Sequence, residues 1–360
     1  MILNLKKTLS FVMNQLTAYA GCIGLTLVGL ASAFLAVFHR NATIYKAKLF
    51  LGSFFFIIKS QDVNFKNKTV DREILSEEVV EEKEKTLVLL RHGESTWNVT
   101  FNRSKNPIFF IPRLVYAGSY ELYLLLSGTR DSWFYDSPLC HEGINQSQEL
   151  AEYLKNLPDS AEPDTQLLHI VNKTEGKNVD PSIVVSSNLR RSLSTAVIAL
   201  NDRLKRTEES IQVHHSLQEI SRNPDTLSIT PAKLQPHPSW IERGYSLDIP
   251  KVYEKQLHVS GNTGNKQASS TGKQRLNEFN EWVFNTIEEE YVIVSGHSLW
   301  FRHFFREFYP AAIDHPGKTK KIHNNGMVAV RVKYQKLKDG SIHCEILPDS
   351  VRSIYKGFCG

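Results

Sequence analysis

Cysteine is scarce in this chain of 360 residues, and no two of its four cysteines form a C-x-x-C pair. Cys22, Cys140, Cys344 and Cys359 are scattered, and Cys22 falls within an apolar segment. This distribution argues against a zinc site and against a disulfide framework, and it favours a reducing compartment.

A large excess of one charge is also missing. The formal net charge is only +5, and the basic residues are dispersed rather than gathered in a stripe. We therefore expect no nucleic-acid partner. Apolar residues make up 41% of the chain, enough for one substantial core plus an extension.

Charge is absent from Leu16 to Phe38, which is long enough to span a bilayer core of about 20 residues. We interpret residues 1–60 as a membrane anchor or targeting region whose Leu16–Phe38 segment is a single transmembrane helix. A cleaved secretory signal is the alternative, because Lys6 and Lys7 give a basic start and Ala31-Ser32-Ala33 resembles a cleavage site. The segment is long for such a signal.

A small charge difference predicts on which side of the membrane the rest of the chain lies. Basic residues lie on both sides of the apolar run, and an excess of about one charge after it favours a cytoplasmic location for the carboxyl-terminal domain. A further alternative is plastid targeting, because "ASAF" followed by a segment without acids up to Asp62 resembles the bipartite presequences of algae with secondary plastids.

A second apolar patch, Leu49–Ile58, is too short to span a bilayer and is expected at the membrane interface or packed on the domain. Residues 61–85 follow as a charged linker.

Three apolar runs end in cations or glycine, as strands of a buried sheet would. The first, from Leu87, ends in Arg91 and His92. The second, Ile183–Val185, leads to a helix that begins near Ser187 and carries Arg191. The third, Tyr291–Val294, breaks at Gly296 before His297. Ligands bind outside the carboxyl ends of such strands, where arginines and helix amino termini can hold a phosphate.

Five ordered sequence blocks resemble the histidine phosphatase superfamily, also called the phosphoglycerate-mutase-like family. They are "RHGESTWN" at 91–98, "DSPLCHEGINQ" at 136–146, "SSNLRRSLST" at 186–195, "LQE" at 217–219 and "SGHSLWFR" at 295–302. The resemblance implies an α/β three-layer sandwich with a mostly parallel central sheet over residues 86–350.

The resemblance also implies a metal-independent phosphomonoesterase without a cofactor. His92 would attack phosphorus to form a phosphohistidine, and Glu219 would protonate the leaving oxygen and then activate water. The phosphoryl oxygens would be held by Arg91, Asn98, Arg191 and His297. Arg190 is expected to face solvent. The substrate is a phosphorylated small molecule or phosphoprotein that the sequence does not identify.

Two alternatives remain at this point: a phosphoglycerate-type mutase, and a non-catalytic membrane adaptor that keeps the fold. Glu219 is followed by "ISRNPDTLS", whereas cofactor-dependent mutases carry a segment like "ERHYG", which favours a phosphatase. The intact set of His92, Arg91, Arg191 and His297 argues against the adaptor.

An insert at about 101–134 is rich in aromatic residues and leucine. It is expected to cap the site, contact the membrane, or form a helical hairpin packed on the domain. Residues 222–272 are predicted to form extended loops. The helix that follows is predicted to pack its stripe of Leu276, Phe279, Val283 and Ile287 against the core. Because every block follows Glu77, a chain starting there is expected to be soluble and active.

Overall fold

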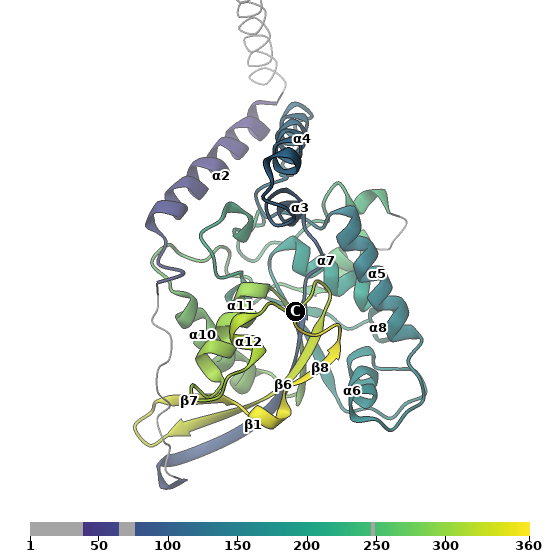
Figure 1. Cartoon of the computed structure of the whole chain (residues 1–360), viewed down its shortest axis with the longest axis vertical. Coiled ribbons are helices and arrows are strands. Elements are labelled where there is room, and N and C mark those ends of the chain that lie inside the picture. The colour runs from purple at the N-terminus through teal and green to yellow at the C-terminus, as the bar shows by residue number, and fades with distance from the viewer. Residues whose placement is uncertain (1–38, 65–75, 246–248) are drawn as a thin grey trace, which may run out of the picture.

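The computed structural model describes residues 39–64, 76–245 and 249–360. Its centre is an eight-stranded sheet with helices on both faces (Figure 1). The strand order is β4-β3-β2-β5-β1-β6-β7, and β8 also pairs with β6. The strands are β1 (Val79–Arg91), β2 (Ser182–Ser187), β3 (Ile211–His214), β4 (Leu257–His258), β5 (Tyr291–Gly296), β6 (Met327–Leu337), β7 (Ile342–Ile346) and β8 (Arg352–Tyr355).

Five neighbouring strands, from β4 to β1, run parallel to one another. The sixth, β6, runs antiparallel to β1, and both β7 and β8 run antiparallel to β6. The expected α/β class is confirmed. The three apolar runs expected as strands lie side by side as β2, β5 and β1, so their carboxyl ends meet at one edge of the sheet.

The central strands are apolar because both of their faces are covered. Val88 and Leu90 of β1 pack into one core, while Leu87 and Leu89 pack into the other, and all four are fully buried. The first core is closed by α5 (His141–Lys155), α6 (Pro163–Asn172), α7 (Arg190–Ala199), α8 (Asn201–Thr207) and α9 (Ile249–Lys255). The second is closed by α10 (Gly272–Thr286) and α11 (Ser298–Phe308). A short helix, α12 (Pro316–Thr319), contacts α11.

Helix α10 begins at a capping box, in which Thr271 and Gln274 satisfy each other's backbone N–H groups. Leu276, Phe279 and Val283 form its fully buried stripe, as the spacing predicts. Ile287 follows the last turn and is only partly buried.

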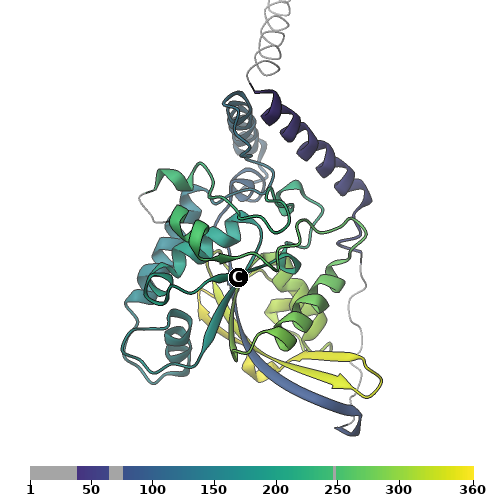
Figure 2. The same ribbon diagram turned by 180° about the vertical axis from the view of Figure 1, so that it is seen from behind.

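Three further helices lie at one end of the molecule (Figures 1 and 2). They are α2 (Arg40–Lys59), α3 (Thr96–Phe101) and α4 (Pro107–Leu126). Helices α2 and α4 contact each other and are joined by an ion pair between Lys46 and Glu121, 2.9 Å long. The insert expected at about 101–134 is thus mainly the long helix α4, and the Leu49–Ile58 patch lies within α2.

The transmembrane segment expected at Leu16–Phe38 lies outside the described residues. None of the helices in the described part of the chain combines the length and the apolar character needed to cross a membrane.

Two segments differ from the sequence expectation. Part of the expected charged linker, residues 79–85, is the first half of β1 and pairs with β6. Glu and Lys side chains alternate along this segment, as expected for a pair of antiparallel strands with one face exposed to water. Residues 222–272 are not loops throughout, because they contain α9 and β4, which extends the sheet beside β3.

Candidate active site

The candidate site lies where β1, β5 and β2 end. His92 follows β1 directly, His297 follows β5, and Arg191 is the second residue of the helix that follows β2. The backbone N–H of His92 donates to the carbonyl of Gly296 over 3.0 Å, which fixes the two strand ends together. The ring centroids of His92 and His297 are 5.1 Å apart.

The surroundings of His92 define its protonation. Its Nδ1 lies 2.6 Å from the carbonyl oxygen of Gly93, which can only accept, so Nδ1 carries the proton and Nε2 keeps a lone pair. Nε of Arg191 donates to that lone pair over 3.3 Å. Burial lowers the pKa of His92 well below its ordinary value, and the charges of Arg191 and Arg91 lower it further. The ring is therefore a neutral imidazole whose Nε2 faces the cationic side chain of Arg191.

Gly93 places His92 through close backbone packing. Its N–H donates to Oγ1 of Thr195 over 3.0 Å, which ties the strand end to α7. A Cβ at Gly93 would lie 2.6 Å from the carbonyl oxygen of Gly143 and 2.7 Å from the side-chain amide of Asn325. Any larger residue would therefore displace the backbone that carries His92.

Unpaired buried nitrogens mark the place for an anion. Neither ring nitrogen of His297 has a hydrogen-bond partner within the described part of the chain, nor does Nε of Arg91. The other end of the Arg91 guanidinium is fixed, because its Nη1 donates to the carbonyl of Ile322 over 2.5 Å. Burial lowers the pKa of His297 well below its ordinary value, with Arg191 and His92 adding to the effect. Buried donors without partners are costly, and phosphoryl oxygens would pair with them.

Arg191 is held by a neighbouring acid that the sequence did not reveal. Its Nη1 donates to the carbonyl of Asp225 over 2.6 Å, and its Nη2 lies 3.3 Å from that residue's Oδ2. Burial raises the pKa of Asp225 to about 6, because desolvation outweighs the attraction of Arg191. Asp225, with its raised pKa, thus contacts the arginine that is expected to hold a phosphoryl group.

Glu219 lies at the amino terminus of α11. Its Oε1 accepts from the backbone N–H of Trp300 over 2.8 Å, and its Oε2 from that of Leu299 over 3.2 Å. It also interacts electrostatically with Arg91. Oε1 also accepts from the backbone N–H of Ile220 over 3.1 Å. The three amides orient the carboxyl group, and Oε2 keeps a second lone pair that can take a proton.

Asn98 forms part of the cap of the neighbouring helix α3. Its side-chain oxygen accepts from the backbone N–H of Ser95, and the Ser95 hydroxyl accepts from the backbone N–H of Asn98. This reciprocal pair is the capping box that begins α3. The structure brings together Arg91, His92, Arg191, Glu219 and His297, and it places Asn98 at this adjoining helix start.

The expectation that Arg190 faces solvent is wrong. Arg190 is only 2% exposed and forms ion pairs with Asp131 and with Asp136, the latter at 3.7 Å. Asp136 is fully buried, also accepts from the backbone N–H of Arg190 over 3.0 Å, and has a raised pKa because of burial. The contacts between Arg190 and Asp136 fix the start of α7, so Arg190 supports the helix that carries Arg191.

A buried charge cluster supports the Glu219 segment. Nζ of Lys266 donates to Oδ2 of Asp62 over 2.7 Å and to the backbone carbonyls of Glu219 and Ser221 over 2.5 and 2.8 Å. Arg275 reaches Oδ1 of Asp62 over 2.5 Å. Burial acts to raise the pKa of Asp62, but Arg275 and Lys266 bring it below its ordinary value.

The sequence offered one signal for this cluster. Asp62 is the first acid after 61 residues without one, and it falls in the segment expected to be a charged linker. Its partners lie about two hundred positions away, so only the fold reveals the contact.

Three histidines outside the site have structural contacts. His214 ends β3 and stacks on Trp282, with ring centroids 4.3 Å apart. His315 precedes α12 and accepts from the backbone N–H of Gly317. His141 begins α5 and lies 2.8 Å from the hydroxyl of Tyr245.

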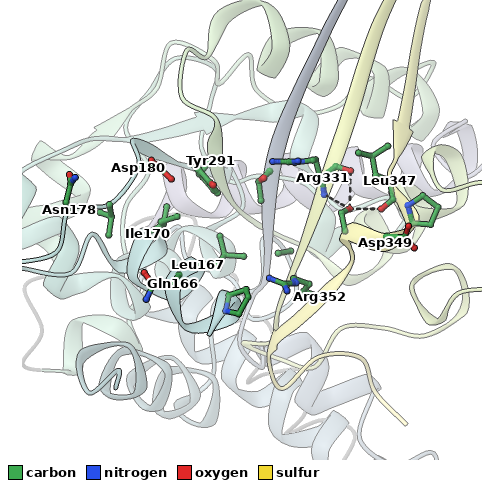
Figure 3. A pocket seen from close by; sticks show the side chains of 16 residues that line it. Gln166, Leu167, Ile170, Asn178, Asp180, Tyr291, Arg331, Leu347, Asp349 and Arg352 are labelled. Atoms are coloured by element: carbon green, nitrogen blue, oxygen red, sulfur yellow. Dashed lines mark hydrogen bonds between the residues drawn. The ribbon is translucent and has the colours of Figure 1, made fainter. Parts of the chain in front are cut away.

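A large cavity lies away from this chemistry. It lies at the other end of the parallel strands, where the pairing of β1 with β5 begins at Thr86 and Tyr291. Figure 3 shows the side chains that line it. Its volume is about 810 Å³, and its charged side chains include Arg331, Arg352 and Asp349. None of the predicted site residues lines it. We therefore assign the reaction to the carboxyl edge on the geometry of His92.

Within residues 39–64, 76–245 and 249–360, no three His, Cys, Asp or Glu side chains converge as a metal site requires. The side-chain charges that act most strongly on His92 are those of Arg191 and Arg91.

The sheet, the five sequence blocks and the grouping of Arg91, His92, Arg191 and His297 resemble the histidine phosphatase superfamily. No protein-family model and no curated protein matches the chain. Solved structures do align with it at low identity. A structure called mycobacterial hydrolase 1 is 15% identical, with 74% of this chain and 97% of that chain covered and a TM-score of 0.34.

A mycobacterial glucosyl-3-phosphoglycerate phosphatase is 14% identical, with 73% and 97% of the two chains covered and a TM-score of 0.32. A protein of Thermus thermophilus is 18% identical, with 68% and 92% covered and a TM-score of 0.28.

Proposed function

We propose that the protein is a phosphomonoesterase that works through a phosphohistidine on His92 and needs neither a metal nor a cofactor. The observation that carries this proposal is the neutral His92 ring, with Nδ1 directed to the Gly93 carbonyl and Nε2 beside Nε of Arg191. A phosphoryl group bound to Arg191 would lie next to the lone pair that must attack it.

The reaction has two steps. Nε2 of His92 forms a bond to phosphorus while the ester P–O bond breaks, and protonated Glu219 gives its proton to the leaving oxygen. Water then attacks phosphorus, the P–N bond breaks, and Glu219 takes the proton that water loses. Arg91, Arg191 and His297 stabilise the charge on the phosphoryl oxygens. Inorganic phosphate leaves, and His92 returns to its neutral form.

The segment after Glu219 supports hydrolysis over mutase activity. The N–H of Ser221 donates to Asp62 over 2.9 Å, and Arg222 donates to Asn64 over 2.8 Å. These residues are engaged with the chain that follows α2, instead of offering a second phosphate site. The substrate is a phosphomonoester of a small molecule or of a protein.

The test uses the full-length chain with an aryl phosphate. His92→Ala should abolish turnover, whereas His141→Ala should keep most of it, because His141 contacts Tyr245 outside the phosphate site. The trapped phosphoenzyme should be acid-labile and base-stable, as a phosphoramidate is. Equal turnover in the wild type and His92→Ala would overturn the mechanism and favour the adaptor.

We further propose that Leu16–Phe38 anchors the chain in a membrane, with the catalytic domain on the cytoplasmic side. The support is the length of this uncharged run. The full-length chain should stay in the membrane fraction after carbonate extraction. Recovery of a chain that begins near Phe34 would instead support secretory or plastid targeting by a cleaved presequence.

A further inference from the structure

Exposed apolar side chains are concentrated on α2 and α4. Seven large ones lie on α2 and eight on α4, whereas six others are scattered over the rest of the described surface. Phe54 and Phe55 of α2 are 58% and 62% exposed, and Ile108 and Phe109 of α4 are 74% and 60% exposed. We call the exposed faces of these two helices the α2–α4 surface. A soluble domain rarely leaves so much apolar area in contact with water.

Each helix is attached to the domain by a narrow stripe. The buried residues of α2 are Ala42, Lys46, Ser53 and Phe56. Those of α4 are Ala117 and Leu124. Figures 1 and 2 both place the two helices at one end of the molecule, beyond the layers that cover the sheet. Most of the circumference of each helix is therefore free to contact something outside the domain.

The charge on α2 indicates the chemistry of that contact. The helix carries four basic residues and no acid, and three of the basic residues, Arg40, Lys48 and Lys59, are exposed. Apolar and aromatic side chains combined with lysine and arginine are typical of helices that lie in the headgroup region of an anionic bilayer. A protein partner would not require this one-sided charge.

The described chain begins at the same place. His39 directly follows, in sequence, the uncharged run that ends at Phe38, and it lies against Gly128, just after α4, where a Cβ would come within 2.2 Å of the His39 ring. The proposed membrane anchor is therefore joined in sequence to the point where α2 begins and α4 ends.

We propose that the α2–α4 surface lies in the interface of a lipid bilayer, with its apolar side chains below the headgroups and its basic side chains among them. This goes beyond anchoring by Leu16–Phe38, because it holds the catalytic domain against the membrane instead of on a tether. Phe56 attaches α2 to the domain, since it packs with Leu227 and Tyr135.

Photo-crosslinking of the full-length chain in vesicles of phosphatidylcholine and phosphatidylserine tests the proposal. Benzoyl-phenylalanine replaces Phe54 in one chain, Phe109 in a second, and Tyr153 of α5 in a third. Tyr153 is the matched control, because it is an exposed aromatic residue, 42% exposed, on a different helix. All three positions are exposed, so the larger ring should be accommodated.

Irradiation should give lipid adducts at positions 54 and 109, detected by mass spectrometry, and far fewer at position 153. Equal lipid labelling at all three positions would overturn the proposal. So would crosslinks to a second copy of the chain, which would make the surface a dimer interface, or to residues 1–38, which would make it an internal contact. Release of the full-length chain by carbonate would refute the Leu16–Phe38 anchor. It would not affect the crosslinking result, which tests the α2–α4 surface alone.

Discussion

Arg191 and its neighbour Arg190 point into different environments from the first turn of α7. Arg191 reaches Nε2 of His92 over 3.3 Å, whereas Arg190 is enclosed with Asp131 and Asp136. Adjacent residues on a helix lie about 100° apart, so one arginine can face the reaction while the other fixes the helix. Two substitutions should separate these roles.

Arg191→Ala should lower kcat by about 10²- to 10³-fold, the cost of losing a preorganised donor to the reacting group. Arg190→Ala should instead lower the free energy of unfolding by about 3–5 kcal/mol, because it leaves the buried Asp136 without its ion pair. Turnover of an aryl phosphate and chemical denaturation measure the two effects. A larger loss of unfolding free energy in Arg191→Ala than in Arg190→Ala would contradict the assignment.

Asp225 should give the enzyme a pH dependence near 6. Its carboxyl group has a pKa raised to about 6 by burial, so it becomes anionic above that pH. The new negative charge beside Arg191 weakens the attraction of that arginine for phosphate, and KM should rise as pH increases through 6. Asp225→Asn should keep KM low over the same range.

The comparison must be the ratio of KM in the wild type to KM in Asp225→Asn across pH. The second ionisation of the substrate phosphate, also near pH 6, affects both proteins and cancels in this ratio. A ratio that stays constant between pH 5 and about 7.5 would show that Asp225 does not titrate beside the bound phosphate.

Asp62→Asn should damage proton donation more than phosphate binding. The change leaves Lys266 and Arg275 without their carboxylate, and Lys266 holds the backbone of Glu219. An alkyl phosphate needs the proton from Glu219, so its turnover should fall by up to about 10²-fold. An aryl phosphate with a good leaving group should lose much less.

Asp159→Asn serves as the control, because Asp159 is an exposed acid paired with Lys177. An equal fall with alkyl and aryl substrates in Asp62→Asn would indicate general destabilisation instead of a misplaced Glu219. The same reasoning changes the expectation for a chain starting at Glu77, which lacks Asp62. That chain should show the same selective loss on alkyl phosphates.

Chelation should leave turnover unchanged. Arg91 and Arg191 supply fixed positive charge next to His92, in the position that a bound cation takes in other phosphoryl-transfer enzymes. Turnover should be measured with excess chelator and then with added divalent cations. A large loss that a cation restores would refute the metal-independent mechanism.

The sequence predicted those parts of the molecule that depend on local patterns. The runs at Leu87, Ile183 and Tyr291 are continuous and apolar because both faces of the sheet are covered, so they could be recognised as buried strands. The residues that follow these strands then indicated a phosphate site.

What the sequence did not predict depends on contacts between distant segments. The spacing could not show that Arg190 turns toward Asp131, because a helix start gives no orientation until its neighbours are known. Asp62 meets Lys266 only through the fold. Residues 79–85 resembled a linker because half of their side chains face water, although their backbone pairs with β6.

Among the described residues, no strand pairs with the second side of residues 79–85 of β1, and such an edge must resist self-association. Residues 79–85 pair with β6 on one side, whereas pairing with β5 begins only at Thr86. An extended strand with an open side can recruit a strand from another molecule. Here Glu81 and Lys83 alternate along it and pair with each other at 2.7 Å. Charges at this spacing disfavour stacking of identical strands, so the part of β1 that resembled a linker carries its own protection against aggregation.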